Sequence, residues 1–482
     1  MPSLDWLVHD RRQLLLFSSD RFLLLLSLFV AVWAALRGRH RLRLGWLLGF
    51  SYYYYYRCNG VLVLVLCGVT LADWAIGLQL ERTRSPAARR LWLTVGIALN
   101  LSLLGFFKYT GFLLQQISLA TGARIDPIDL FLPIGISFHV FQSVSYLVDV
   151  YRRRFKATRS LFEYALFLSF FPQVVAGPIV RAGELLPQLR QPHEPDPHEI
   201  GEGLFRVVLG VAKKALLADY LARYVDLVFA APGAYSGFEL LLGVYAYAGQ
   251  IYFDFSGYSD MALGFARILG VRLPENFASP YRATSITDFW RRWHMSLSRW
   301  LRDYLFVPLC GSRPGQARRY LALLITMLLA GLWHGAGWIF VAWGGLHGLA
   351  LAAERFEARL RRAPAGRWRV ALGWLLTFHL VAVLWVLFRA ASFELCWQVL
   401  GGIGAGWEPA RVAAVLGVRR WLVLAVVAGL GLSVLPPRWR PWLEARFGRV
   451  PWPVQALLLV GVLEAAGALS SSELTPFIYF QF

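Results

Sequence analysis

A histidine at position 334 stands in an uncharged run of 34 residues, from Tyr320 to Ala353. An imidazole inside such an apolar run is costly unless it faces a polar cavity or a partner, which makes it a functional-site candidate. Gly331, Gly335 and Gly337 carry no side chain and let backbone or substrate approach the ring. A neutral imidazole in this setting can act as a general base on a hydroxyl or thiol, or carry an acyl group briefly.

The segment from Ser285 to Leu305 is predicted to form one amphipathic helix. Ser285 and Asp288 make a capping-box-like start. Apolar side chains recur at three- and four-residue steps and form one stripe, comprising Phe289, Trp293, Leu297, Trp300 and Tyr304. Four arginines lie mostly off that stripe, at Arg291, Arg292, Arg299 and Arg302. Such a helix either lies in the membrane interface or lines the floor of a polar cavity.

His294 and Ser298 stand one turn apart on the flank of this expected helix. His294 is a second candidate for chemistry, since histidine is the side chain that most readily exchanges a proton near neutral pH. The alternative is that His294 only caps the helix and forms hydrogen bonds, and the pattern leaves both open.

The run from Gln250 to Asp260 concentrates polar side chains inside an apolar segment, including Asp254, Ser256 and Tyr258. A buried Asp254 needs hydrogen-bond donors, and an Arg or His from the Ser285–Leu305 helix could supply them. Substrate positioning and simple helix–helix adhesion are equally good interpretations of this run.

The spacing of the candidate residues argues against both a metal site and a serine-hydrolase site. His334 and His347 are 13 residues apart, which on one helix places them on nearly opposite faces, and no carboxylate stands at ligand spacing. The serines near Gly257 lack the Gly-x-Ser-x-Gly elbow. A phosphate-binding glycine loop followed by lysine is also missing. We therefore expect no metal and no bound cofactor.

The composition is that of a polytopic helical membrane protein. Hydrophobic residues make up 57% of the 482 positions, charged residues only 16%, and the mean hydropathy is +0.50. Counting about 20 apolar residues per span predicts roughly 10 to 13 membrane-embedded helices in one domain over residues 1–482. The predicted segments lie near 20–36, 44–56, 60–80, 91–115, 130–150, 161–180, 203–230, 238–265, 320–353, 369–389, 420–436 and 452–470. The segment at 320–353 is long enough for two short helices, or one helix and a re-entrant piece.

The net charge of +20 comes mainly from arginines in short connectors, such as Arg37–Arg43 and Arg313–Arg319. Charge that flanks apolar segments orients a protein in the membrane and contacts anionic lipid, so membrane lipids are expected partners. The aromatic-plus-basic pattern of an RNA-binding module is missing, and nucleic acid is not expected. Without a signal-peptide cleavage site, Phe22–Ala35 is expected to remain as an anchor. The four cysteines are too scattered for a disulfide framework or a zinc site.

Seven motifs spread over most of the chain carry a family resemblance. They are LPIGISFHVFQ at 132–142, FPQVVAGPI at 171–179, YFDFSGYSD at 252–260, PENF at 274–277, FWRRWHMSLS at 289–298, LWHGA at 332–336 and PFIYFQF at 476–482. The chain resembles the membrane-bound O-acyltransferase superfamily, in the branch of the alginate O-acetylation membrane protein. His139 departs from the tyrosine that many relatives have, which affects only local packing.

The resemblance implies an all-α fold in which helices, some interfacial or re-entrant, surround a central funnel, with the family motifs at about 130–390. It implies that His334 is the catalytic residue and His294 the second functional position. Lower-ranked candidates for substrate binding are Asp254, Ser256, Tyr258, Arg291, Ser298 and Trp333. The acyl donor, acetyl-coenzyme A by resemblance alone, is expected from the cytoplasm, and the acceptor from the other side of the membrane.

The function predicted by the resemblance is O-acetylation of an exported polysaccharide such as alginate, by a multi-pass protein of the bacterial inner membrane. Relatives work beside a periplasmic SGNH/esterase-like acetyltransferase that completes the transfer to the sugar, so such a partner is expected here. One alternative keeps the fold and changes the cargo to D-alanine, transferred onto teichoic acid. A second alternative is a polysaccharide or lipid transporter with His334 in its path, but paired inverted halves with broken helices are not evident.

Overall fold

The computed structural model describes residues 8–10, 15–17, 19–126, 128, 130–191, 193–360 and 366–469. Every regular element within these ranges is a helix, so the all-α prediction is confirmed. The chain groups into two compact units, one of residues 1–203 and 261–274 and one of residues 204–260 and 275–482. A single domain over residues 1–482 stays a prediction. The PFIYFQF motif at 476–482 lies outside the described residues.

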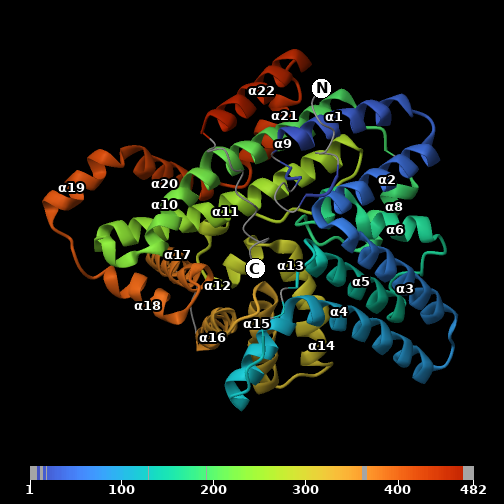
Figure 1. Cartoon of the computed structure of the whole chain (residues 1–482), viewed down its shortest axis with the longest axis horizontal. Helices are drawn as coiled ribbons and strands as arrows, with labels where there is room; N and C mark the ends of the chain where they lie inside the picture. Colours follow the sequence, from blue (N-terminus) through green and yellow to red (C-terminus); the bar gives the residue numbers. More distant parts are fainter. Residues whose placement is uncertain are drawn as a thin grey trace. The chain divides into compact units, whose positions relative to one another are not determined.

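The first unit is built from the N-terminal helices, coloured blue to green in Figure 1. Its elements are α1 (Asp20–Ala35), α2 (His40–Asn59), η2 (Gly60–Leu62), α3 (Val63–Arg82), α4 (Pro86–Thr121), α5 (Ile136–Tyr151), α6 (Leu161–Ser169), α7 (Phe171–Val174) and α8 (Ala182–Arg190). Two further helices, α9 (Pro197–Val211) and α11 (Gly237–Ile268), pass from one unit into the other.

The second unit holds the remaining elements. They are η3 (Ala212–Ala218), α10 (Asp219–Ala230), η4 (Pro232–Ala234), η5 (Pro280–Arg282), α12 (Ile286–Arg292), α13 (Met295–Leu301), η6 (Arg302–Phe306), α14 (Val307–Cys310), α15 (Gln316–His334), α16 (Trp338–Leu360), α17 (Arg367–Arg389), α18 (Phe393–Gly402), α19 (Pro409–Val418), α20 (Arg420–Ser433), α21 (Trp439–Phe447) and α22 (Trp452–Leu469). Of these, η3 and η6 are π-helical, a rare geometry that is frequent at functional sites.

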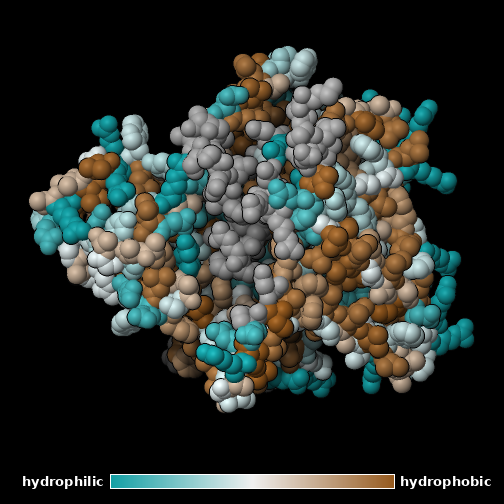
Figure 2. All heavy atoms as spheres, viewed as in Figure 1, coloured by the Kyte–Doolittle hydropathy of each residue, from teal (hydrophilic) through white to brown (hydrophobic). Residues whose placement is uncertain are grey.

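Apolar side chains face outward over the helices of the first unit, as expected for lipid contact. Leu64 and Leu101 are 69% and 51% exposed, and Figure 2 shows brown hydrophobic side chains gathered over α3–α5. Three helical stretches of the described chain are long and apolar enough to cross a membrane, His40–Arg82, Pro86–Thr121 and Arg367–Arg389. A fourth candidate is the pair α19 and α20, which is bent by 84°. The predicted total of 10 to 13 embedded helices is not tested by this measure.

Three predicted spans have other boundaries in the structure. Residues 44–56 and 60–80 belong to one helical stretch of 43 residues, His40–Arg82. Residues 161–180 do not form a single span, because α6 ends at Ser169 and α7 is a single turn that begins at Phe171. Pro172 explains this break, since its ring and missing N–H cannot continue the hydrogen bonds of the preceding helix.

The uncharged run 320–353 forms two helices, which was one of the two alternatives. α15 and α16 are joined by the turn Gly335–Gly337 and pack closely along their length. Gly331 and Gly344 stand at the contact. A Cβ atom on Gly344 would overlap the carbonyl oxygen of Met327, and one on Gly331 would lie 3.0 Å from the Cα of Gly344. Small residues at such a contact let two helix backbones approach each other closely in a membrane.

The prediction of one helix over Ser285–Leu305 is wrong, because α12 ends at Arg292 and α13 begins at Met295. In an unbroken helix the Ser296 N–H would bond to the Arg292 carbonyl. Here Ser296 N–H donates to Asn276 Oδ1 at 3.2 Å, and the Arg292 carbonyl accepts from Ala278 N–H at 3.0 Å. The segment 276–278 therefore replaces the helical hydrogen bonds with tertiary ones. The start at Ser285 is as predicted, with its hydroxyl accepting from Asp288 N–H at 3.1 Å.

An ion network inside the second unit fixes α21. Arg206 Nε lies 2.9 Å from Glu444 Oε1, and Arg440 Nη2 lies 2.6 Å from Glu275 Oε2. Asp260, which is 3% exposed, accepts from Lys213 Nζ at 2.6 Å. Because charges buried this deeply must be paired, the network holds α9, α11 and α21 in one arrangement.

The close approach of α15 and α16 predicts a difference between two adjacent glycines. Gly344→Ala should lower the free energy of unfolding by about 1–3 kcal/mol, because the new methyl group meets backbone that cannot move aside. In Gly345→Ala the methyl group would lie 3.2 Å from the end of the Leu328 side chain, which can shift. Thermal unfolding of the two purified variants in detergent measures the difference, and equal melting temperatures would contradict this account of the contact.

Candidate active site

His334 is the last residue of α15 and is buried among aromatic rings. Its side chain is 4% exposed. The ring centroid lies 4.8 Å from that of Trp333, 5.1 Å from that of Trp343 on α16 and 5.2 Å from that of Phe388 on α17. Three helices therefore build the surroundings of the imidazole, and these rings keep bulk water away from it.

His294 lies between α12 and α13 in a left-handed backbone conformation, with φ 43° and ψ 54°. This region is uncommon for residues other than glycine and is found where the surrounding structure imposes it, often at functional sites. The buried His294 ring contacts Phe255 at 4.6 Å and Trp333 at 6.3 Å. Trp333 thus touches both candidate histidines, which makes it the link between them.

Asn276 holds the His294 turn in place, a role that the sequence pattern did not show. Its carbonyl oxygen accepts from Met295 N–H at 3.0 Å, and its side-chain oxygen accepts from the Ser296 hydroxyl at 2.7 Å. Asn276 is 1% exposed. Its place in the PENF motif was the only signal available, because the partner residues lie about 20 positions away in the sequence.

A cavity of about 450 Å³ lies beside these residues within the second unit. It is lined mainly by α12, α13, η6, α15 and α16, through Thr287, Trp290, Arg291, Met295, Ser298, Arg299, Leu301, Arg302, Phe306, Leu323, Thr326, Met327 and Leu351. Met327 and His334 are seven residues apart on α15, which is two turns and about 10 Å along the helix. Met327, which lines the cavity, and His334, the last residue of α15, therefore lie on the same face of this helix.

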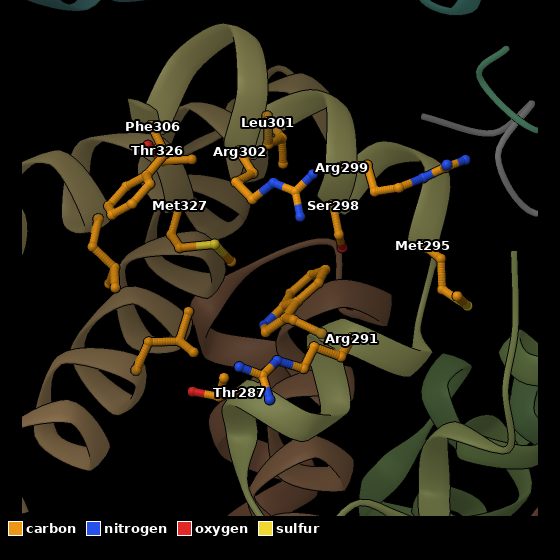
Figure 3. Close-up of a pocket in the computed structure, with 13 residues that line it drawn as sticks. Thr287, Arg291, Met295, Ser298, Arg299, Leu301, Arg302, Phe306, Thr326 and Met327 are labelled. Carbon is orange, nitrogen blue, oxygen red and sulfur yellow. The ribbon is translucent and has the colours of Figure 1, made fainter. Parts of the chain in front are cut away.

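Three arginines belong to the lining of the cavity. In Figure 3, Arg291 and Arg302 extend over the cavity from opposite sides, whereas Arg299 extends away from it. Arg302 Nε lies 2.7 Å from Asp303 Oδ1, and no acidic group of the described chain lies within ion-pair distance of Arg291. Ser298 also lines the cavity, and its hydroxyl donates to the Trp293 carbonyl at 3.3 Å. Of the predicted binding residues, Arg291 and Ser298 are the two that line the cavity.

Asp254 is paired with a lysine, and a donor from the Ser285–Leu305 segment stays a prediction. Lys214 Nζ lies 2.6 Å from Asp254 Oδ1 and 2.8 Å from Asp219 Oδ1. Lys214 belongs to the π-helical η3 and is 6% exposed. A lysine inside the apolar segment 203–230 was a signal in the sequence, since a buried ammonium group requires a carboxylate partner.

Ser256 and Tyr258 lie on α11 with exposed fractions of 1% and 5%. Neither residue lines the cavity, nor does Asp254. The polar run of α11 instead meets the π-helix, where Gly257 lies against the backbone of Gly210 and Lys214. The helix–helix interpretation of this run thus has direct structural support for Asp254. No cluster of three or more His, Cys, Asp or Glu side chains suited to a metal ion occurs in the described ranges.

The model of the membrane-bound O-acyltransferase family matches residues 4–397. A protein of Azotobacter vinelandii described as a probable alginate O-acetylase AlgI is 42% identical over 80% of this chain and 77% of its own length. A peptidoglycan O-acetyltransferase of Helicobacter pylori is 37% identical over 74% of this chain and 73% of its own length. A teichoic acid D-alanyltransferase of Bacillus subtilis is 27% identical over 54% of this chain and 69% of its own length.

The chain belongs to the membrane-bound O-acyltransferase family, so the resemblance seen in the sequence motifs is confirmed. It is a membrane protein and an O-acyltransferase enzyme. The roles of His334 and His294 stay predictions. The structure adds that both rings are buried, that both contact Trp333 and that an arginine-bearing cavity lies on the same helices.

The left-handed backbone at His294 allows a test that distinguishes a catalytic role of the imidazole from a purely structural role of the turn. His294→Gly should be more stable than His294→Ala by about 1 kcal/mol or more, because glycine adopts this conformation without a Cβ clash. If the imidazole takes part in catalysis, both variants lose acyl transfer to a similar degree despite this difference in stability. Thermal unfolding and acyl-transfer rates of the same preparations test this, and full activity in the glycine variant would show that only the backbone turn matters.

Proposed function

We propose that this protein is an inner-membrane O-acetyltransferase that draws acetyl groups from a cytoplasmic thioester, acetyl-coenzyme A, for the O-acetylation of an exported polysaccharide such as alginate. The observation that carries the proposal is a buried imidazole, His334, on the same helix face as a cavity that carries three arginines. Arginine pairs with phosphate oxygens through two parallel hydrogen bonds, and coenzyme A is a phosphate-bearing thiol carrier.

In the proposed reaction the acceptor hydroxyl attacks the thioester carbonyl carbon. A new C–O bond forms and the C–S bond breaks, which gives an acetyl ester and a thiol. His334 takes the proton from the attacking hydroxyl and returns it to the leaving sulfur, so the imidazole ends neutral as it began. Trp333, Trp343 and Phe388 support this step by keeping water, a competing acceptor, out of the site.

Charge supports a cytoplasmic position for the cavity mouth. Arg299 and Arg302 lie in or next to the cavity, and Arg313, Arg318 and Arg319 follow closely in the chain. Arginine and lysine concentrate on the cytoplasmic side of membrane proteins. The donor would enter from that side, and a periplasmic SGNH/esterase-like partner would deliver the acetyl group to the sugar.

Acetyl transfer is favoured over D-alanyl transfer by the cavity lining as well as by the relatives. None of the 13 described lining residues is acidic, and three are arginines. A D-alanyl thioester carries an ammonium group that this lining would repel. The relatives named as O-acetylases or O-acetyltransferases are also more similar to this chain, at 42% and 37% identity against 27%.

Replacing His334 tests the proposed chemistry. His334→Ala should lower the rate of acetyl transfer from labelled acetyl-coenzyme A by at least about 100-fold, because a positioned general base contributes about that much or more. The matched control is His379→Ala, whose ring bonds to the Tyr245 hydroxyl at 2.9 Å, away from the cavity lining. Retention of full activity in a folded His334→Ala protein would overturn the assignment.

The arginines of the cavity should determine donor affinity. The double variant Arg291→Ala/Arg302→Ala should raise the KM for acetyl-coenzyme A about tenfold or more, since hydrogen bonds to charged groups contribute about 1.5–3 kcal/mol each. Its kcat should change little, because neither side chain lies at His334. S-acetyl-N-acetylcysteamine has no phosphate groups, so its KM should be the same in the variant and the native protein. Arg313→Ala, an exposed residue outside the cavity lining, is the control, and an equal rise in KM there would refute the assignment.

A further inference from the structure

A second cavity, of about 500 Å³, lies within the first unit and is not used by the proposed reaction. Three helices line it. The first turn of α2 contributes His40 and Arg41, the start of α6 contributes Ser160 and Glu163, and the end of α8 contributes Arg190. The ends of three helices thus bring charged and polar side chains to one hollow.

This cavity carries an unbalanced positive charge. Arg190 is neutralised, since its Nη2 lies 2.6 Å from Glu163 Oε2. Arg41 lines the same cavity and has no ion-pair partner in the part of the chain that the structure describes. The first turn of α2 contains no acidic residue and no side-chain cap, so its N–H groups add to the positive potential. An anion can therefore bind here without displacing a protein carboxylate.

The lining changes from polar to apolar along both α2 and α6. Leu44 follows Arg41 by three residues, and Leu166 follows Glu163 by three residues, so each pair shares one helix face. Both leucines line the cavity, together with Phe162, which is 37% exposed. The cavity therefore has a positively charged end and an apolar end, about one helical turn apart.

The positively charged end lies at the membrane boundary. His40 is the first residue of His40–Arg82, a stretch that is long and apolar enough to cross a membrane. Near its other end, Glu81 accepts a hydrogen bond from Ala157 N–H, and Ser160, three residues further on, lines the cavity beside His40. Three residues span at most about 11 Å, whereas the hydrocarbon core is about 30 Å thick. Both ends of the stretch therefore lie on one side of the membrane.

Exposed basic side chains gather on this side of the first unit. They flank the three positions His40, Arg82 and Ala157, and they comprise Arg37, Arg39, Arg41, Arg82, Arg84, Arg90, Arg153, Arg154, Lys156 and Arg159. Figure 2 shows hydrophilic side chains, in teal, projecting from the right-hand edge of this unit. Arginine and lysine concentrate on the cytoplasmic side, where the anionic lipids of the membrane attract them.

We propose that this cavity is a binding site for the headgroup of an anionic phospholipid in the cytoplasmic leaflet. Arg41 and the free N–H groups of α2 hold the phosphate, and His40 and Ser160 donate hydrogen bonds to the headgroup oxygens. The acyl chains leave the cavity past Leu44 and Phe162. One phosphodiester carries a single negative charge, which matches the one unpaired guanidinium group. Neither the acyl donor nor the acceptor enters this inference, so it is independent of the proposed function.

The apolar end of the cavity favours a lipid over a soluble anion. Free phosphate would occupy the polar end alone and leave Leu44, Leu166 and Phe162 in contact with water. A glycerophospholipid covers these side chains with its glycerol and the first methylene groups of its chains, and burying apolar surface is favourable. The cavity thus matches both parts of an amphipathic ligand.

Thermal unfolding of the purified protein in dodecyl maltoside measures this binding. Dioleoyl phosphatidylglycerol should raise the melting temperature, with saturation, by about 2 °C or more, because a ligand of the folded state stabilises it. Dioleoyl phosphatidylcholine has the same chains but no net charge and should not. Arg41→Gln should weaken the phosphatidylglycerol effect about tenfold or more in lipid concentration, and Arg41→Lys should keep part of it. No stabilisation of the native protein, or equal stabilisation by both lipids, would overturn the proposal.

Arg90→Gln is the matched control, since Arg90 is exposed on the same side of the first unit but does not line the cavity. It removes the same charge as Arg41→Gln and should leave phosphatidylglycerol binding as in the native protein. Native mass spectrometry should find one retained phosphatidylglycerol in the native and Arg90→Gln proteins and none in Arg41→Gln. Equal losses in the two variants would show a diffuse attraction to the basic surface, which would refute a defined site.

Glycerophosphoglycerol, the same headgroup without acyl chains, distinguishes a lipid site from a site for a soluble phosphate. It should stabilise the native protein only at concentrations at least about tenfold higher than phosphatidylglycerol, because it makes no contacts with the apolar end. Equal potency of the two compounds would refute the assignment to a lipid. Both measurements report binding and not turnover, so their outcome does not depend on whether the protein transfers acetyl groups.

Discussion

The close packing of α15 against α16 is the constraint on which the candidate site depends. Gly331 and Gly344 leave no room for a side chain between the two helix backbones. This approach brings Trp343 of α16 against His334 of α15 and places His347 on the same side. In an apolar environment, where water does not drive helices together, such backbone proximity is a main source of helix association.

The second half of the site depends on a helix that tertiary contacts interrupt. Asn276 and Ala278 take over the hydrogen bonds that would have joined α12 to α13. As a result His294 turns toward Phe255 and Trp333, while Arg291 and Ser298 line the cavity. One short segment therefore contributes both to the aromatic surroundings of the histidines and to the charged wall where a phosphate-bearing donor would bind.

The sequence predicted much of this arrangement, and its errors have identifiable causes. The buried stripe of Phe289, Trp293 and Leu297 was correct, because apolar periodicity reports burial whether or not the helix is continuous. The break at His294 could not be seen, since the partners that cause it come from a separate segment of the chain. The Lys214 partner of Asp254 was not predicted for the same reason, because proximity in the fold and not along the chain selected it.

The sequence by itself determined the all-α membrane class, the family and the choice of His334 and His294 as candidates. Composition, hydropathy and local motifs can be read from the sequence alone, because they do not depend on how the chain folds. Only the tertiary structure decided that Trp333 touches both histidines, that Asp254 is paired with a lysine and that Arg291 and Ser298 line one cavity. These relations depend on how helices pack, and that packing is set by long-range contacts such as those of Gly344 and Asn276.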